Sequence, residues 1–531
     1  MNMKLFKITL LVFVTLLSVA CGMQKSECEP IWDNAAIVVY ANIGELHSKG
    51  NIASLDFSAQ IAELDSEDSA SAELLTNIIK SPSSSGIAVD KPAYIAINEF
   101  NSNYIVSDML IALEISDAQQ LDTTLKCLGE DVDSSDITIK GDKRIIKLDT
   151  NLYLGYDSER LVILKQNSKD ATTNVAENLI HQLDYAPADM SRFAELDAAV
   201  YLDIDRLFAI TLESLPMDSE EELYTIEDMK SLYSSYFNPE ANATIGLRFD
   251  NGAITLTSDC EGISEKITSQ LMKVNGNHLN MLDASPIAML YMGVNGEAIA
   301  ETLNTAINAM LSEDDAIGAY NEINIYKNIA LGIISSIEGD LMLALSNANG
   351  ELIEDVFGEK KLVFTTANAL FTADVKDNYI MDNVKTYGQG LLSNNGNNAY
   401  SISAFGNKIN IGQNDNIFYV GVNDNAHKKS PSAAEQEWSN KLNDCYAYAM
   451  IDFNRLFSSN FGKALLSTIY DNTNSSEERD AVKLYTENLD GLYILSNGND
   501  QIIHNECRIS LKNQTTNALE QIVNIAYKEI K

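Results

Sequence analysis

Carboxylates are the residues of this 531-residue chain best placed for acid–base chemistry, since 76 Asp and Glu accompany only 37 Lys and Arg. Asp203 and Asp205 follow one short apolar run, and Asp452 follows another. A pair of carboxyl groups at a set separation can hydrolyse a glycosidic bond. The same positions suit a helix N-cap, whose side-chain oxygen accepts a hydrogen bond from the first turn. Because apolar residues recur at helical spacing behind them, we expect N-caps at Asn42, Asp117, Asp203, Asp377 and Asp452, and no catalytic residue.

Histidine and nucleophile motifs indicate no enzymatic site. The five histidines are His47, His181, His278, His427 and His504, and no two have the i, i+4 spacing of a helical zinc site. The chain has no GxSxG elbow, no SxxK with its companion motifs and no GxxxxGK[ST] loop. We therefore expect each histidine to be a surface residue or a hydrogen-bonded one, and we expect no cofactor.

Two clusters of side-chain oxygens could attract calcium. Asp131, Asp133 and Asp136 form one cluster, and residues 414–416 (Asn-Asp-Asn) form the other. Neither has the twelve-residue spacing of an EF-hand loop with its closing glutamate. Asp and Asn are favoured in turns for their own hydrogen bonding, so we expect turns here and no metal site.

Cys21 is the cysteine whose position indicates chemistry. Lys4 and Lys7 precede ten apolar residues, 8–17, and the small residues 18–20 (Ser-Val-Ala) lead into Cys21. This three-part pattern is typical of a secretory signal and is too short to span a membrane. It resembles a lipobox, with Ser18 where leucine is commonest. We expect a signal peptide over residues 1–20, lipidation of Cys21, a tether over 21–32 and attachment to a membrane through the lipid.

The remaining cysteines and the charge limit the other partners. Five cysteines follow Cys21, an odd number with no CxxC pair, so their pairing stays open and a zinc site is not expected: Cys28, Cys127, Cys260, Cys445 and Cys507. The net charge is −39, which repels nucleic-acid phosphates and anionic headgroups. Tyr224, Tyr233 and Tyr236 share one acidic segment; they could stack on a sugar or a partner, but packing at the core or its rim is the expected role.

Recurring segments suggest an internal duplication. Residues 198–208 (AAVYLDIDRLF) resemble 447–457 (AYAMIDFNRLF), and 36–46 resemble 287–298. Several such matches follow in the same order, each with a short apolar strand, Asn or Asp, and a helix. We therefore expect an α+β fold with two tandemly duplicated halves, 33–280 and 281–531, each mixing a mostly antiparallel sheet with packing helices.

The lipobox, the opening residues 34–50 (NAAIVVYANIGELHSKG) and the recurring strand–Asp–helix units resemble Bacteroidota lipoproteins of domain-of-unknown-function family 4836. The resemblance covers about residues 30–525. It implies a lipid-anchored protein of the bacterial cell envelope, in the outer membrane, and it brings no catalytic residues. Residues 22–27 after the cysteine are of mixed charge, so the resemblance leaves open which side of the membrane the protein faces.

Three functions are consistent with these features. The first is a non-catalytic binding or structural protein with an envelope protein or glycan as partner. The second is a carbohydrate-active or other hydrolase, which needs a deep cleft holding two acids or an acid and a histidine. The third is a helper of folding or assembly, which needs a contiguous exposed apolar groove. We expect the first of them.

Overall fold

A computed structural model describes most of the chain after residue 34. The described residues are 35–57, 76–100, 106–128, 137–149, 151–165, 193, 195–214, 226–282, 285–310, 317–354, 360–396, 398–404, 406–423, 441–472, 479, 482–483, 486–499 and 502–530. Two compact units divide the chain: unit 1 is Met1–Gly262 with Asn513–Lys531, and unit 2 is Ile263–Lys512. The domain boundary expected at 280/281 stays a prediction. The signal peptide, the tether and Cys21 lie outside the described residues.

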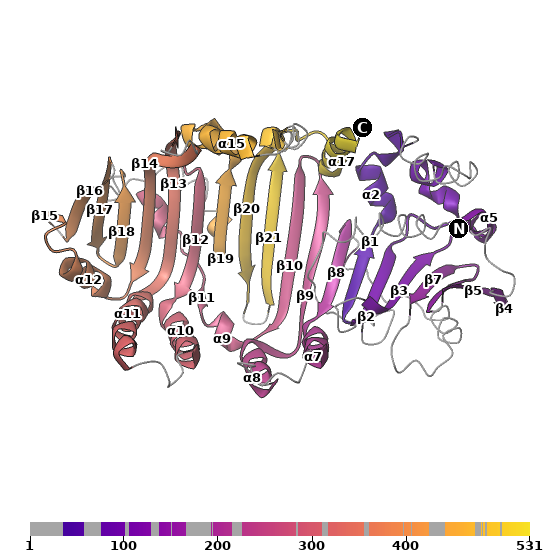
Figure 1. Ribbon diagram of the computed structural model, residues 1–531, viewed down its shortest axis with the longest axis horizontal. Coiled ribbons are helices and arrows are strands. Elements are labelled where there is room, and N and C mark those ends of the chain that lie inside the picture. Colours follow the sequence, from indigo (N-terminus) through magenta and orange to yellow (C-terminus); the bar gives the residue numbers. More distant parts are fainter. Residues whose placement is uncertain are drawn as a thin grey trace. The chain divides into compact units, whose positions relative to one another are not determined.

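Unit 1 is built on strands β1 to β10 (Figure 1). Strand β1 lies between β2 and β8, β3 lies between β2 and β7, and β4–β7 form a meander. The strands are β1 Ile37–Ala41, β2 Ala93–Phe100, β3 Val106–Glu114, β4 Ile137–Lys140, β5 Lys143–Asp149, β6 Leu152–Tyr156, β7 Arg160–Lys165, β8 Ala198–Asp203, β9 Phe237–Asp250 and β10 Ala253–Ile263. The helices are α2 Ile43–Lys49, α5 Ala118–Leu128, α7 Ile204–Ser214, α8 Ile226–Tyr236 and α17 Ala518–Ile530, with 3₁₀ turns η1 Ile52–Ser54 and η2 Pro82–Ser85.

Unit 2 places β12 at its centre, between β13 and β19. On one side β14, β18, β17, β16 and β15 follow β13, and on the other β20 and β21 follow β19. The strands are β11 Leu271–Met272, β12 Ala288–Asn295, β13 Ile337–Glu354, β14 Lys360–Val375, β15 Ser393–Gly396, β16 Ala399–Ala404, β17 Asn407–Asn414, β18 Ile417–Val422, β19 Cys445–Asp452, β20 Leu489–Gly498 and β21 Ile502–Leu511. The helices are α9 Glu265–Thr268, α10 Gly296–Met310, α11 Ile317–Ser335, α12 Tyr379–Tyr387, α14 Phe453–Ser458 and α15 Asn460–Asn472, with the 3₁₀ turn η5 Asn277–Met281.

The expected fold class, α+β with two tandemly duplicated halves, is wrong. The described strands belong to one large sheet of 21 strands, and the registers are antiparallel, so the sheet dominates the molecule. The structure does not show the duplication. Segments such as 36–46 and 198–208 share a strand, an Asn or Asp and a helix, and the local rules of strand formation and helix capping produce that order without any copying.

The expected N-caps at Asn42, Asp117, Asp203 and Asp452 are confirmed, but the one at Asp377 is wrong by one residue, because the N-cap of α12 is Asn378. Asn42 Oδ1 accepts a hydrogen bond from Glu45 N at 3.1 Å. Asp203 and Asp452 each accept one at 2.9 Å from the backbone N–H three residues later in the chain. Asp117 Oδ1 accepts from two backbone N–H groups at the start of α5, at 2.9 and 3.0 Å, and Asp377 Oδ1 accepts from one at the start of α12, at 2.9 Å. These aspartates are therefore engaged with backbone and are not grouped for catalysis.

The last described helix packs within unit 1 by contacts with residues far away in the sequence. Tyr527 of α17 donates to Asp56 O at 2.6 Å, and its ring meets Phe57 edge-on at 5.4 Å between centroids. Asn517, just before α17, donates to Phe249 O at 2.9 Å. A buried ion pair also fixes this unit, since Lys49 Nζ lies 2.7 Å from Asp197, which is 2 % exposed. Chain segments separated by more than 250 residues thus belong to one compact unit.

Candidate functional site

A buried polar cluster joins η5 to the central strands of unit 2. It consists of His278, Tyr291, Asp340, Thr372 and Asp374. Thr372 Oγ1 lies 2.8 Å from His278 Nδ1, and His278 Nε2 lies 3.0 Å from Asp374 Oδ1. Tyr291 donates to Asp340 at 2.5 Å, and the same carboxylate accepts from the backbone N–H groups of residues 275 and 276, each at 2.9 Å. Asp340 N in turn donates to Asp374 at 2.9 Å.

The carboxylate fixes the position of one proton. An ionised carboxylate only accepts hydrogen bonds, so His278 Nε2 carries the proton that faces Asp374. Burial alone would raise the pKa of Asp374, but the hydrogen bond and charge of His278 and the N–H of Asp340 outweigh it and lower that pKa. Burial, together with the neighbouring Asp340, raises the pKa of Tyr291.

The order hydroxyl–imidazole–carboxylate is that of a nucleophile, its base and the acid that orients it. Here His278 and Thr372 both have 0 % exposure, so no substrate can reach either group. Their contacts instead satisfy polar atoms that the sheet and η5 would otherwise bury without partners. We conclude that the cluster is structural and holds η5 against β13 and β14.

We predict that acid weakens unit 2 through this cluster. The folded-state pKa of Asp374 is lowered, so its stabilisation is present above the unfolded value of about 3.9 and is lost as the pH falls through the folded value. Urea midpoints measured by circular dichroism between pH 6 and pH 2.5 should therefore fall less steeply in Asp374→Asn than in the native chain. Equal slopes in the two proteins would contradict the assignment.

The other histidines and the carboxylate pair show no reactive arrangement. His47 Nε2 lies 2.7 Å from Ile79 O, and His504 is half-buried on β21, while His181 and His427 lie outside the described residues. Asp205 accepts from Tyr233 Oη–H and from Glu240 N. Tyr233 also stacks on Phe208 at 4.1 Å between centroids, so its expected packing role is confirmed. Tyr224 lies outside the described residues.

The Asn-Asp-Asn segment 414–416 is the turn between β17 and β18, as its sequence predicts. Next to this turn, the side-chain amide nitrogen of Gln413 donates to three oxygens: Asp377 O at 3.3 Å, Asn378 Oδ1 at 3.0 Å and Asp415 O at 3.2 Å. An N–H donor thus occupies the place a cation would take. In the described part of the chain, no group of three or more His, Cys, Asp or Glu could hold a metal; Asp131, Asp133 and Asp136 lie outside it.

The described cysteine side chains are unpaired thiols. Cys260, Cys445 and Cys507 form no disulfide, and burial raises the pKa of each. A raised pKa keeps a thiol protonated at neutral pH and makes it a poor nucleophile. Cys21 and Cys28 lie outside the described residues, as does the side chain of Cys127.

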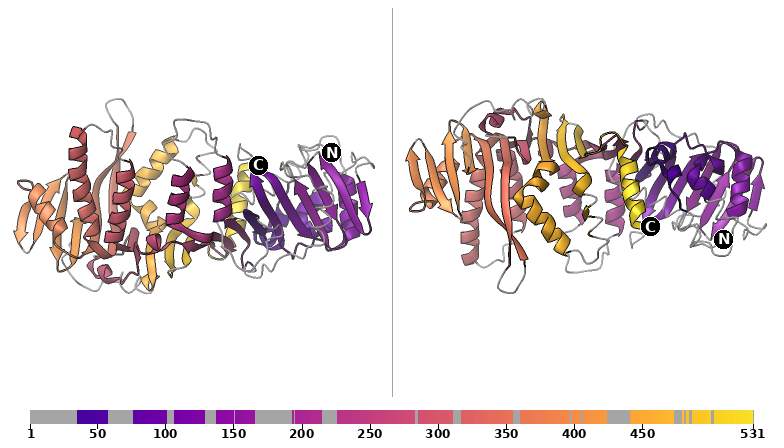
Figure 2. Two further views of the ribbon diagram at one scale, coloured as in Figure 1. Left: turned by 90° about the horizontal axis from the view of Figure 1, so that it is seen from below. Right: turned by 90° about the horizontal axis from the view of Figure 1, so that it is seen from above.

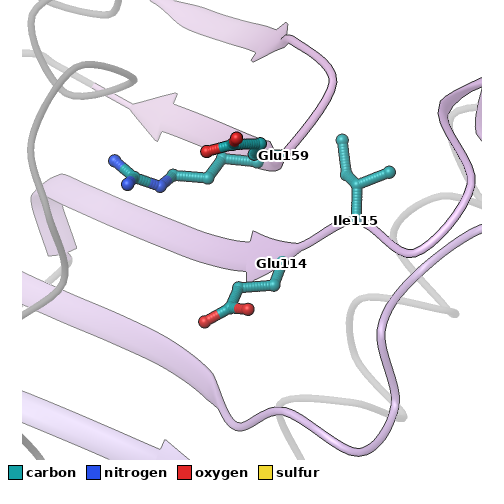
Figure 3. Close-up of a pocket in the computed structure, with 4 residues that line it drawn as sticks. Glu114, Ile115 and Glu159 are labelled. Carbon is teal, nitrogen blue, oxygen red and sulfur yellow. The ribbon is translucent and has the colours of Figure 1, made fainter.

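A small surface pocket of about 240 Å³ lies in unit 1, lined by Glu114, Ile115, Glu159 and Arg160 (Figure 3). Glu114 is the register partner of Arg160, and Ile115 N donates to Glu159 O at 2.8 Å. The two carboxylates come from neighbouring segments, with Ile115 standing apart from them (Figure 3). No histidine or hydroxyl nucleophile lines the pocket, so it supplies carboxylates and a guanidinium but no base–nucleophile pair.

A further feature of unit 2 is one face of its central strands. The sheet register places eleven apolar residues on that face, which we call the apolar face: Ala288, Leu290 and Met292 of β12, Leu341, Leu343 and Leu345 of β13, Ala447, Ala449 and Ile451 of β19, and Leu492 and Ile494 of β20. Leu343, Leu290, Ala449 and Ile494 are consecutive register partners and form its middle row.

Only the opposite face of these strands is buried. There Met289, Tyr291, Met342, Tyr448 and Met450 form a core with residues 274–282. On the apolar face every residue is half-buried or exposed, and Leu290, Leu343 and Ile494 are 38, 49 and 44 % exposed. An antiparallel sheet with one solvated face normally carries polar residues on that face. An open face made of Leu, Ile, Met and Ala is therefore evidence of an interaction surface.

Helices border the apolar face. Helices α10 and α11 connect β12 to β13 at one end of these strands, and α14 and α15 follow β19 at the other end (Figure 1; seen from below and above in Figure 2). On the β14 side, Ile380 and Met381 of α12 cover Phe371, the register partner of Leu343. Helix α15 also packs against β13 and β14, and α14 packs against β19 and β20, yet Leu290, Leu343 and Ile494 in the middle row remain exposed.

A protein-family model matches most of the chain. The model of the family described as "Domain of unknown function (DUF4836)" matches residues 30–519. The chain belongs to this family. The match includes both the buried polar cluster and the apolar face of this DUF4836 member, and the family has no assigned function. Comparisons with curated proteins and with solved structures gave no significant match. Among the described residues of this DUF4836 chain, no helix is both long and apolar enough to cross a membrane.

Sequence reasoning missed the polar cluster and the apolar face. His278 is separated from Thr372 and Asp374 by more than 90 residues, so no local motif joins them. The signal that was available is the acid within an apolar strand, as in GDLMLAL (339–345), because a carboxylate there must find partners. For the apolar face the signal is the unbroken apolar run AMLYMGV (288–294), which lacks the alternation of a solvated strand.

Proposed function

We propose that this DUF4836 protein is a non-catalytic lipoprotein of the bacterial cell envelope that binds an apolar partner through the apolar face. The single observation that carries the binding role is the open face around Leu290, Leu343 and Ile494. The hydrolase alternative gains no support, because the imidazole nearest to a hydroxyl and a carboxylate is fully buried. The exposed apolar surface is the feature expected of a protein that receives another molecule.

The location is supported by the N-terminal sequence. The charged, apolar and small-residue parts before Cys21 form an export signal, and the resemblance to Bacteroidota lipoproteins agrees with lipid on that cysteine, in the outer membrane. Several acyl chains on one residue hold a protein stably, because each buried methylene contributes about 0.8 kcal/mol.

We predict that Cys21→Ala abolishes membrane attachment. The protein is produced in the organism it comes from, grown with radiolabelled palmitate. The native chain should carry the label and sediment with membranes. The Cys21→Ala variant should carry no label and should be found mostly outside the membrane fraction. Cys28→Ala is the matched control, because it removes the next cysteine in the chain and should change neither result. Equal palmitate labelling of native chain and Cys21→Ala would refute the anchor.

The binding role is tested by photo-crosslinking in intact cells. A benzophenone amino acid is placed at position 343 on the apolar face and, as a control, at Ile139 on β4 of unit 1, which is 68 % exposed. The proposal predicts a light-dependent adduct, of protein or lipid, from position 343 and much less from position 139. Equal yields from the two positions would argue against a binding role for the apolar face.

A further inference from the structure

We propose that the occupant of the apolar face is hydrocarbon, the acyl chains of lipids with uncharged or zwitterionic headgroups. This inference rests on the proposed function, since it names the partner of the same face. It depends on three observations: the atoms the face presents, the charge of the chain, and the dimensions of the face.

The apolar face presents only carbon and thioether sulfur. All three positions on each of β12, β13 and β19 are Ala, Leu, Ile or Met, and polar residues begin beyond them, at Ser496 of β20 and at the exposed Asn347 of β13. An extended polypeptide lying on this face would bring backbone N–H and C=O groups to a surface that has no partner for them, which is costly. An acyl chain has no such groups, so it can cover the face without leaving polar atoms unsatisfied.

The charge of the chain selects the headgroup. The net charge is −39, and none of the eleven residues of the apolar face is Lys or Arg. An anionic headgroup at the edge of the face would find no cation on it and would be repelled by the chain as a whole. Lipids without net charge avoid this cost, and the preference should weaken as salt screens the repulsion.

The width of the apolar face agrees with the length of one acyl chain. The four strands from β13 to β20 span three spacings of about 4.8 Å, or about 14 Å. One leaflet of a bilayer contributes about half of a hydrocarbon core of about 30 Å. A single extended acyl chain therefore matches the width of the apolar face, and small residues such as Ala288 and Ala449 leave room for it.

The test uses the full chain carrying Cys21→Ala, so that neither its own lipid nor detergent competes. The uncharged probe N-phenyl-1-naphthylamine and the anionic acyl probe cis-parinaric acid are titrated by fluorescence. The double variant Leu343→Gln, Ile494→Gln should bind the uncharged probe about tenfold more weakly, because it removes two apolar contacts. The control Ile139→Gln, Leu391→Gln replaces two side chains that are each 68 % exposed outside the face and should bind normally. Far-UV circular dichroism confirms that both variants fold.

Charge is tested in the same titration. The anionic probe should bind the chain more weakly than the uncharged probe, and 0.5 M NaCl should reduce the difference between their dissociation constants. If the anionic probe bound more tightly than the uncharged probe at low salt, the choice of uncharged headgroups would be overturned. Equal binding of the uncharged probe by chain and double variant would overturn the hydrocarbon site.

The outcomes separate this inference from the proposed function. If position 343 crosslinks to protein in cells and the uncharged probe does not bind, the binding role stands and the hydrocarbon inference fails. If the chain suppresses aggregation of an unfolded protein, loses this activity in the double variant and binds no probe, the occupant is polypeptide and the inference is overturned. If neither crosslink nor probe binding is found, both proposals fail.

Discussion

Replacing Asp340 with alanine is expected to destabilise unit 2 by about 3–5 kcal/mol, because a buried phenol and two backbone N–H groups lose their acceptor together. The carboxylate has 0 % exposure and accepts from Tyr291 Oη and from the N–H groups of Asn275 and Gly276. No water can replace it without entering the core. Hydrogen exchange should show faster opening of η5, β13 and β14 in Asp340→Ala.

The matched control for this change is Asp382→Ala on α12. Asp382 is 66 % exposed and its partner Lys385 is exposed as well, so we expect a change of at most about 0.5 kcal/mol. Similar exchange rates in Asp340→Ala and Asp382→Ala would mean that the buried polar cluster does not hold η5 in place. The double variant Tyr291→Phe, Asp340→Ala should recover part of the loss, since it removes the orphaned phenol along with its acceptor.

Gly86→Ala is expected to cost unit 1 about 3 kcal/mol or more, because the added methyl group has no space and the backbone no alternative. Gly86 has φ +87°, and a Cβ would meet backbone atoms of Asp117 and Leu121 at the start of α5, with Asp117 O at 2.5 Å. The carbonyl of Gly86 also accepts from Ser116 N and Asp117 N, at 2.9 and 3.1 Å. Urea unfolding of the variant, followed by circular dichroism, should show the loss.

Gly141→Ala separates crowding from conformational strain. Gly141 lies in the two-residue turn between β4 and β5 and has φ +68°, but a Cβ added there would meet no atom within 4 Å. Only the left-handed conformation is penalised at this position, at about 1–2 kcal/mol. Equal losses in the two variants would show that the contact between Gly86 and α5 contributes nothing to stability.

Short-range features of the fold could be predicted from the sequence. The N-caps at Asn42 and Asp203 depend on one side chain and the next three residues, so local rules suffice. The turn at Gly141 can be predicted by the same kind of local rule, because a glycine between two alternating runs permits the positive φ that it adopts. The same locality explains the error in fold class: strand–cap–helix segments recur for local reasons, and recurrence alone does not establish two α+β halves.

Long-range features could not be predicted. The contact of His278 with Asp374 depends on how η5 crosses the sheet, and nothing within the neighbouring residues specifies that crossing. The apolar face could not be predicted for a different reason. The run around Leu290 reads as a strand that is apolar on both sides, but the sequence does not say whether a second layer covers each side. The register and the exposed fractions of Leu290 and Leu343 decide that only one side is covered.

The central claim, that the apolar face is covered by a partner in the envelope, is tested most directly by thiol labelling at position 343. Leu343→Cys is labelled with N-ethylmaleimide in intact cells and after purification, and Ile139→Cys serves as the reference for access of the reagent. Peptide mass spectrometry separates these sites from the native cysteines. We predict that position 343 reacts much more slowly in cells than after purification, while position 139 reacts equally in both. Equal reactivity of position 343 in the two settings would contradict the claim.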